Sequence, residues 1–145
     1  ILRTYFEHPA ITTDVIVGFP GETQEEFETT RAFIEKVGFY ETHVFKYSRR
    51  NGTKAAFMPD QVPEQKKAER SQILLDLCKK KKKEFEDQMI GKQVEVLLEE
   101  TFEKDGVLYR TGLTKEYVKV AVKADNTREN QILEMTIENH SQIMD

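Results

Sequence analysis

The stretch Thr12-Thr13-Asp14-Val15-Ile16-Val17-Gly18-Phe19-Pro20-Gly21-Glu22-Thr23 decides how the first half of the chain folds. Its β-branched apolar run before Gly18 is typical of a strand that is covered on both faces. The two glycines flank a proline and predict a tight turn, because glycine tolerates positive φ and proline holds φ at about −65°. Thr23 and Glu26 then have the spacing of a capping box and predict the start of a helix.

A strand that ends in a glycine turn before a helix has two interpretations. It is either an ordinary connection or part of a ligand site at the carboxyl end of a sheet. The turn contains no Lys or Arg, and the pattern GxxxxGK[ST] is absent. A loop that binds a nucleoside triphosphate is therefore not expected.

The next segments predict a βαβ unit. Apolar residues at helical spacing run to Val37, Gly38 ends the helix, and residues 39–47 have the composition of a second strand. A helix of this length joins parallel strands in a right-handed crossover. The basic turn at 48–54 follows the second strand on the ligand side of such a sheet, although its Asn-Gly pair is also a good turn sequence.

A long helix is expected from Pro63 and Glu64 to about Gln88. Its apolar stripe comprises Ile73, Leu74, Leu77, Cys78, Phe85 and Met89. Five lysines at 79–83 interrupt this stripe. The run is either a solvated helix face or a patch that contacts phosphates.

After Gly91 the hydrophobic period changes from helical to two. Four or five short strands in residues 89–145 predict a small antiparallel barrel. We therefore expect two domains, 1–88 and 89–145, with a boundary near Ile90. The net charge of −4 comes from the second domain, which has seven basic and eleven acidic side chains.

Composition narrows the chemistry. The 145 residues include one cysteine, Cys78, and three dispersed histidines, so no metal ligands are expected in this chain. The sequence has neither a long apolar span nor a signal-peptide pattern, and the single cysteine is compatible with a reducing cytosol. We expect a cytoplasmic protein without membrane association. The first residue is not Met, and we expect a fragment of a longer protein.

Three motifs in order resemble the tRNA methylthiotransferases, which are radical-SAM enzymes of the MiaB, MtaB and RimO type. They are Asp14-Val-Ile-Val-Gly-Phe-Pro-Gly-Glu-Thr23, then His43-Val-Phe-Lys-Tyr-Ser-x-Arg-x-Gly-Thr-x-Ala-Ala56, then Gln61-Val-Pro-Glu64. The segment from Gly38 to Ser48 looks most like the MtaB branch, which modifies threonylcarbamoyladenosine beside the tRNA anticodon. The resemblance covers essentially the whole chain.

This resemblance implies a fold and an enzyme. Residues 1–88 would be the C-terminal part of a radical-SAM (β/α) barrel, and residues 89–145 a TRAM domain, an OB-like RNA-binding barrel. The full-length enzyme would use S-adenosylmethionine (SAM) and two [4Fe–4S] clusters. The family's Cys-x-x-x-Cys-x-x-Cys motif is absent, and one cysteine cannot ligate such a cluster. The fragment alone is therefore expected to be inactive and to contain no catalytic residue.

The resemblance also implies a cofactor wall. Ile16 matches an aliphatic position against the adenine, Asp14 matches a polar position near SAM, and Gly18 would let the backbone approach the adenosyl group. Tyr47 and Ser48, after the second strand, are expected to face the same cavity. For each residue, ordinary barrel packing is the alternative. Glu22 lies one place late for the acidic position of the superfamily pattern.

The expected RNA contacts lie in two places. Arg49, Arg50 and Lys54 would meet tRNA phosphates at the barrel mouth. In the second domain, the expected stacking and charge surface comprises Tyr109, Arg110, Lys115, Tyr117 and Lys119. The acidic net charge of that domain argues against tight RNA binding.

The expected partners are the tRNA anticodon stem-loop, the N-terminal portion of the same protein, and a second copy covering the exposed edge of the strand at 11–17. Two alternatives remain open. The first is an enzyme acting on isopentenyladenosine or on a ribosomal protein, and the second is a non-catalytic RNA-binding or interaction module.

Overall fold

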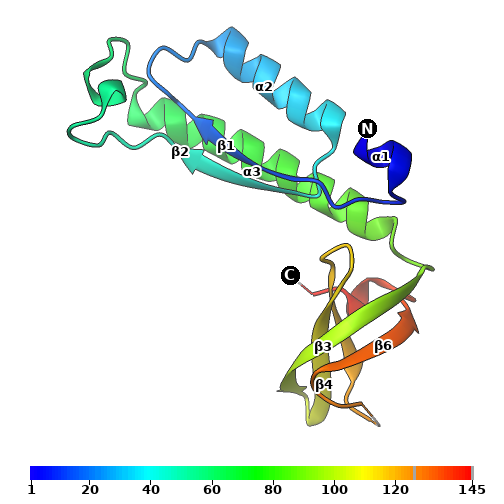
Figure 1. Ribbon diagram of the computed structural model, residues 1–145. Coiled ribbons are helices and arrows are strands. Elements are labelled where there is room, and N and C mark those ends of the chain that lie inside the picture. Colours follow the sequence, from blue (N-terminus) through cyan, green and yellow to red (C-terminus); the bar gives the residue numbers. More distant parts are fainter. Residues whose placement is uncertain (126, 145) are drawn as a thin grey trace. The chain divides into compact units, whose positions relative to one another are not determined.

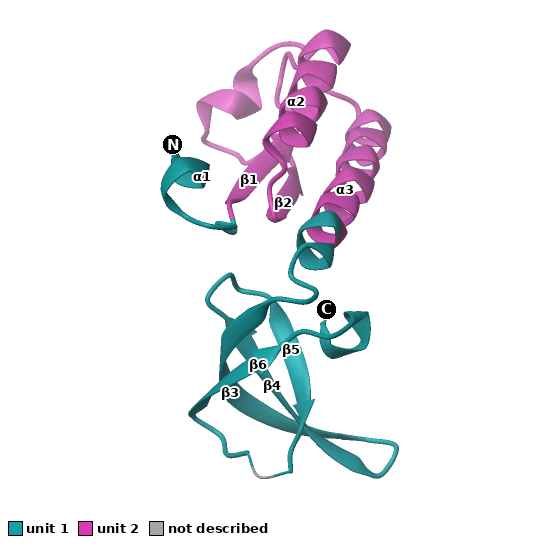
Figure 2. Ribbon diagram, turned by 90° about the vertical axis from the view of Figure 1, so that its right-hand side faces the viewer, with its two compact units in different colours: residues 1–10, 84–145 teal, residues 11–83 magenta. Residues whose placement is uncertain are grey.

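The computed structural model describes residues 1–125 and 127–144 of the chain. These residues form two compact units, one of residues 11–83 and one of residues 1–10 together with 84–145 (Figure 2). The fold is mixed, with a parallel pair of strands and helices in the first unit and an antiparallel sheet in the second. Among the described residues, none of the helices has the length and apolar character needed to span a lipid bilayer.

The unit of residues 11–83 is a βαβ arrangement followed by a long helix (Figure 1). Strand β1 (Thr12–Val17) pairs in parallel with β2 (Glu41–Lys46), and α2 (Gln24–Val37) connects them. A 3-10 turn, η1 (Lys54–Phe57), precedes α3 (Glu64–Asp87). The predicted parallel βαβ unit is confirmed.

The ends of α2 follow directly from the sequence. The hydroxyl of Thr23 accepts a hydrogen bond from the Glu26 amide, and the Glu26 carboxylate accepts one from the Thr23 amide. This is the predicted capping box, which satisfies two amides at the start of the helix. Gly38 ends the helix in the left-handed region, with φ of 62°. Both predicted helix signals are confirmed.

The parallel sheet has one packed face and one open face. Alternate residues Val15 and Val17 of β1 and Val44 of β2 belong to a core that α2 and α3 complete with Phe27, Ile34, Leu74 and Cys78. The other face carries exposed side chains of both strands. The expectation that the first strand is covered on both faces is wrong for the described residues, because both helices that complete the core pack on the same face of the sheet.

Helix α3 buries a stripe that extends further toward its start than the apolar residues suggest. Leu74 is fully buried, and Arg70 and Lys67, one and two turns earlier, are 4% and 8% exposed. Ile73, which was expected in the stripe, is 41% exposed. The face of α3 that packs is therefore set by positions 67, 70, 74 and 78, a helical spacing that includes two cations.

The second unit contains a four-stranded antiparallel sheet. The order is β5 (Lys119–Lys123), β4 (Val107–Thr114), β3 (Gln93–Lys104) and β6 (Gln131–Thr136). Its core comprises Val94, Val96, Leu98, Val118, Val120 and Ile137. Two short helical turns, α1 (Leu2–Tyr5) and η2 (His140–Gln142), complete the unit.

The antiparallel sheet is not a closed barrel within the described residues. Strands β5 and β6 are its two edges and do not pair with each other. Instead the C-terminal segment runs beside β5, where Ile143 forms an isolated antiparallel bridge with Val120. The predicted antiparallel strands are confirmed, and the predicted barrel closure is replaced by this single bridge.

Candidate functional site

The open face of the parallel sheet holds two residues of the predicted cofactor wall. Ile16 lies opposite Phe45 in the register, and the two side chains are 56% and 51% exposed. One pair earlier on this face, Asp14 Oδ1 lies 3.5 Å from Nδ1 of His43. The strands thus present a two-residue apolar shelf near their carboxyl ends, beside the contact between Asp14 and His43.

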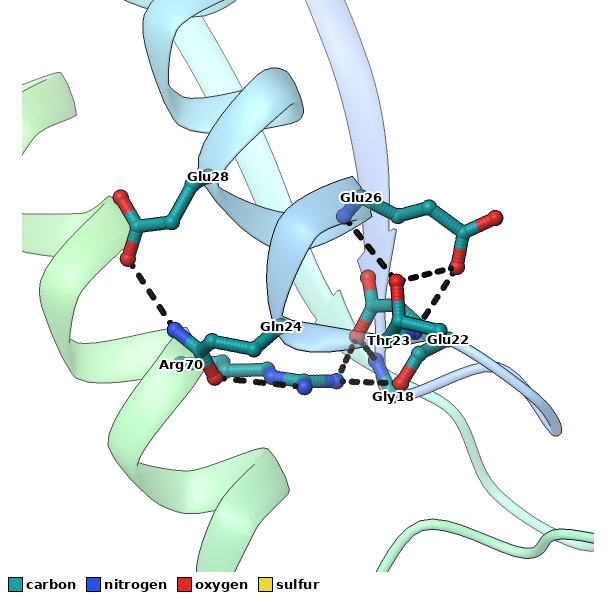
Figure 3. A network of polar contacts seen from close by, with 7 residues as sticks. All are labelled: Gly18, Glu22, Thr23, Gln24, Glu26, Glu28 and Arg70. Atoms are coloured by element: carbon teal, nitrogen blue, oxygen red, sulfur yellow. Dashed lines mark hydrogen bonds and ion pairs between the residues drawn. The ribbon is translucent and has the colours of Figure 1, made fainter.

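The turn after β1 is held by a buried ion pair (Figure 3). The Gly18 amide donates to Oε2 of Glu22 at 2.7 Å, and Nη1 of Arg70 donates to the same oxygen at 2.5 Å. Arg70 also donates to the Glu22 carbonyl at 3.1 Å and to Oε1 of Gln24 at 3.4 Å. The two charged side chains are 5% and 13% exposed, so the pair is largely removed from water and its geometry is well defined.

Lys67 lies directly behind Gly18. A Cβ on Gly18 would meet Cγ of Lys67, and Gly18 has φ of 70°, which side-chain-bearing residues rarely adopt. The expected reason for this glycine was close approach of an adenosyl group. In the structure the space is filled by the Lys67 stem, and the Gly18 amide is already bonded within the turn.

Tyr47 joins this packing at the end of β2. Its ring meets the ring of Phe19 edge-on, with centroids 5.3 Å apart, and Nζ of Lys67 lies 5.4 Å from its centroid. Its hydroxyl is buried and has no hydrogen-bond partner in the described part of the chain. The exposed Ser48 follows it in the chain. Lys67 therefore contacts both Tyr47, the residue that follows β2, and the turn that follows β1.

Two further carboxylates near these strand ends are held in the charged form. Hydrogen bonds from the amide and hydroxyl of Thr23 lower the pKa of Glu26. A hydrogen bond from Lys46, at 2.8 Å, lowers the pKa of Glu64. Both effects follow from donors placed at the charged form of the carboxylate.

The basic turn after β2 gathers three predicted RNA contacts in one segment. Arg49, Arg50 and Lys54 are all exposed. The turn is shaped by Thr53, whose hydroxyl donates to the Arg50 carbonyl at 2.8 Å and accepts from the Ala56 amide at 3.3 Å. The cations therefore project from a defined turn that follows the carboxyl end of β2.

In the antiparallel sheet each predicted RNA-binding cation is paired with a glutamate. Nη1 of Arg110 lies 3.8 Å from Glu129, and Nζ of Lys119 lies 3.4 Å from Glu100. Lys115 forms an ion pair with Glu95. A phosphate would compete with these carboxylates, so the predicted cationic surface is largely neutralised.

The two predicted stacking tyrosines lie in different hollows of this unit. Tyr109 stacks on Phe102 and lines a hollow beside the C-terminal segment. Tyr117 is 71% exposed and lines another hollow with Leu97, Leu113 and Ile132. The sequence grouped Tyr109 and Tyr117 into one surface, and the structure does not bring them together.

Sequence reasoning missed the buried cations behind the turn. Arg70 and Lys67 lie four and seven positions before Leu74, the helical spacing of the buried stripe, and this was the available signal. Sequence reasoning also passed over Phe102, although it alternates with polar neighbours on β3. Glu22 had no assigned role, and it proves to be the acceptor that joins the turn to α3.

The described residues do not form a metal centre. No group of three or more His, Cys, Asp or Glu side chains that could hold a metal ion occurs among them. Cys78 is 9% exposed in the core between the sheet and α3. Burial raises the pKa of its thiol more than the hydrogen bond with Thr42 lowers it, so the thiol stays neutral at ordinary pH.

The amino-acid sequence of this chain is similar to the sequences of known enzymes. The chain is 47% identical over 116 residues to the tRNA-2-methylthio-N(6)-dimethylallyladenosine synthase of Acetivibrio thermocellus, covering 80% of this chain and 24% of that protein. It is 43% identical over 129 residues to the threonylcarbamoyladenosine tRNA methylthiotransferase MtaB of Bacillus subtilis, covering 88% of this chain and 29% of that protein. This chain is a homologue of the tRNA methylthiotransferases.

The match covers only part of the length of these relatives, and it does not distinguish their substrates. The chain spans about a quarter of the length of the curated relatives it matches. The tRNA-2-methylthio-N(6)-dimethylallyladenosine synthase of Corynebacterium urealyticum also matches, at 39% identity over 139 residues, covering 94% of this chain and 26% of that protein. Enzymes with different named substrates are thus similarly related, and the identities do not separate the two branches. No family model matches the chain.

Proposed function

We propose that this chain forms part of a cytoplasmic tRNA methylthiotransferase, in which residues 1–88 supply one wall of the SAM site and residues 89–145 act as a TRAM-like RNA-binding domain. The observation that carries the proposal is the open face of β1 and β2, where Ile16 and Phe45 form an exposed apolar shelf. In an isolated α/β unit such a face is normally covered, because exposed apolar side chains gain free energy when they are buried.

The residues present fit an adenosyl group better than they fit an iron–sulfur cluster. An adenine offers a flat apolar surface to Ile16 and Phe45, and Asp14 is placed to accept hydrogen bonds on the same face. Tyr47 and Ser48 stand at the end of the neighbouring strand and would border the same space. The described residues offer no cluster ligands, so the two [4Fe–4S] centres would be held by other parts of the enzyme.

The basic turn supports a nucleic-acid substrate. Arg49, Arg50 and Lys54 follow the carboxyl end of β2, the edge at which a parallel sheet places its ligands. Arginine side chains there would hold the phosphates of an anticodon stem-loop and fix its position, without reading its sequence. The chain would thus help present the adenosine that receives the methylthio group at C2.

The substrate we propose is threonylcarbamoyladenosine. This choice rests on the segment from Gly38 to Ser48, which resembles the MtaB branch. Isopentenyladenosine and a ribosomal-protein side chain are the competing substrates. A non-catalytic RNA-binding or interaction module is the competing function.

A chimeric enzyme tests the function and the substrate together. Residues 1–145 replace the matched segment of the Bacillus subtilis protein in cells that lack it, and modified nucleosides are measured by mass spectrometry. We expect methylthio-threonylcarbamoyladenosine to be restored. Methylthio-isopentenyladenosine would instead assign the other tRNA branch, and failure of a stably produced chimera to modify any RNA would contradict the enzyme proposal.

The SAM wall is tested by changing the shelf. In the chimera, Ile16→Asp should raise the KM for SAM at least about tenfold, because a carboxylate replaces the apolar contact with adenine. Leu75→Asp is the matched control, since Leu75 is also exposed, at 44%, but lies on α3. Equal effects of the two changes would remove Ile16 from the cofactor site.

A further inference from the structure

The antiparallel sheet and the C-terminal segment enclose a hollow of about 600 Å³. Strands β3, β4 and β5 form one wall and residues 138–144 the other. Its lining includes Phe102, Lys104, Tyr109, Lys123, Asn139 and Gln142. A space of this size is within the usual range for small-ligand sites, about 300–1,000 Å³.

An aromatic pair forms the first wall. Phe102 and Tyr109 are direct cross-strand partners, and their rings stack with centroids 5.4 Å apart and planes 20° apart. The register continues from Tyr109 to Lys123 on β5. The sheet therefore places two nearly parallel rings and a cation in one row, and both rings are half-buried beside the hollow.

The opposite wall is held in place by its own hydrogen bonds. The Met144 amide donates to the Lys119 carbonyl at 2.8 Å, and Ile143 bridges to Val120. The Gln142 side chain accepts from the Glu138 amide at 2.7 Å. This wall presents amide and carboxylate groups of the kind that bond the edges of nucleobases.

The charges at the hollow are differently arranged from those elsewhere in the unit. Arg110, Lys115 and Lys119 each pair with a glutamate. Among the described residues, neither Lys104 nor Lys123 makes an ion pair, and both line the hollow. The carboxylates of Asp105 and Glu138 also line the hollow, without an ion pair to either lysine, and the two ammonium groups are the ones that a phosphate would contact.

We propose that this hollow binds an unpaired nucleobase of single-stranded RNA, stacked against the Phe102–Tyr109 pair, with the adjoining phosphates on Lys104 and Lys123. Base stacking on aromatic side chains and flanking cations are the standard means of holding single strands. The proposal deepens the proposed function and rests on it, because it locates the RNA contact of the TRAM-like unit. The proposed site replaces the broader surface predicted from the sequence, which comprised Tyr109, Arg110, Lys115, Tyr117 and Lys119.

The second hollow of this unit fits RNA less well and supplies the control. It is lined by Tyr117, Leu97 and Ile132, and its charged lining residues are Glu95, Glu99 and Lys115, of which Lys115 is already paired with Glu95. The cation that lines this second hollow is therefore already neutralised, whereas the first hollow has two lysines without an ion pair beside its own two carboxylates. Tyr117→Leu therefore removes an exposed aromatic ring of the same unit without touching the proposed site.

The test titrates the 145-residue chain with an anticodon stem-loop that carries 2-aminopurine in its loop. Tyr109→Leu and Phe102→Leu should each weaken binding at least about fivefold and reduce the quenching of 2-aminopurine that stacking causes. Lys123→Gln should lower the slope of log K against log salt by about 0.7, the value expected for one phosphate contact on a single strand. Tyr109→Phe should bind normally, as should Tyr117→Leu.

Several outcomes would overturn the inference. Unchanged affinity and salt slope in Lys123→Gln would do so even if the Leu variants fail to fold, since Lys123 is exposed. Weakened binding in Tyr117→Leu alone would move the site to the second hollow, and binding of a basic peptide in place of RNA would assign a protein partner. If the chimera still modifies tRNA, these results would reject RNA binding in the hollow without contradicting the proposed function.

Discussion

The two sheets of this chain bury their apolar residues in different ways. The antiparallel sheet keeps Val96, Leu98 and Val120 fully buried within residues 84–145. The parallel pair buries Val17 on one face only and leaves Ile16 more than half exposed on the other. Each sheet has a core of its own, but the parallel pair also has an apolar face that the described residues of its unit do not cover.

This difference explains why side chains from another element hold the turn after β1. In the parallel unit the turn after β1 is held by Arg70 and Lys67, which reach it from α3. A two-stranded sheet is weakly stable alone, so the geometry of its turns depends on the helices packed on it. In the antiparallel unit, cross-strand register alone sets the positions of Phe102 and Tyr109.

The largest effect is expected from Arg70→Ala. The change leaves the buried Glu22 carboxylate without its cation and should lower the free energy of unfolding by about 3–5 kcal/mol. This loss of stability is measured by urea unfolding, with hydrogen exchange in residues 11–47 as the readout. Lys66→Ala, an exposed neighbour on α3, is the control, with an expected change within about 0.5 kcal/mol. Similar losses for both variants would mean that the ion pair contributes little.

Leu98→Ala should destabilise the antiparallel unit by about 3 kcal/mol, through lost burial and the cavity left behind. Leu97→Ala changes the adjacent residue, which is 43% exposed, and should have a much smaller effect. Hydrogen exchange should show lost protection in β3 and β4 and unchanged protection in β1 and β2. Loss of protection in both sheets would show that the two units unfold together, and would contradict the view that each sheet has its own core.

Gly18→Ala should lower stability by about 1–3 kcal/mol, because alanine is strained at positive φ and its Cβ meets Lys67. Gly21→Ala is the matched control, since Gly21 has φ of 86° but nothing within 4 Å of the position that a Cβ would occupy. The difference between the two variants, measured by chemical denaturation, isolates the contact with Lys67. Equal losses would attribute the whole effect to backbone strain.

Thr23→Ala should cost about 1 kcal/mol at neutral pH, the usual contribution of an N-cap. Hydrogen bonds from the amide and the hydroxyl of Thr23 lower the pKa of Glu26 from 4.5 in the folded state. The alanine variant keeps the amide and loses the hydroxyl, so it also loses the stabilisation by the hydroxyl of the charged carboxylate, which is present above 4.5 and disappears as the pH falls through the folded pKa. The stability difference between Thr23→Ala and the unmodified chain should therefore narrow in acid. Thermal unfolding from neutral to acidic pH measures it, and a difference that widens in acid would contradict the assignment.

The smallest effect is expected on the open face. Phe45→Ser should change stability by no more than about 0.5 kcal/mol, because the side chain is 51% exposed. Val44→Ser, on the packed face of the same strand, should cost clearly more. A large, concentration-dependent loss in Phe45→Ser would show instead that a second copy covers this face or the adjoining edge of β1, of which the sequence analysis predicted only the edge.

Local features of the fold were predictable because their causes lie within a few residues. The capping box at Thr23, the helix end at Gly38 and the parallel pairing of the two strands all follow from spacing and residue type. Asp14 and Ile16 were assigned to the cofactor wall from a resemblance, and their exposure was not expected from the sequence. Their role as a SAM contact remains a prediction.

The sequence by itself determined the βαβ order, the helix limits and the change to a two-residue period after Gly91, since each is written in local hydrophobic spacing. Only the tertiary structure decided that Arg70 reaches a turn 48 residues earlier, and that Tyr109 and Tyr117 line separate hollows. Such contacts depend on how strands pair and helices pack across long stretches of chain, and spacing within one element does not specify them.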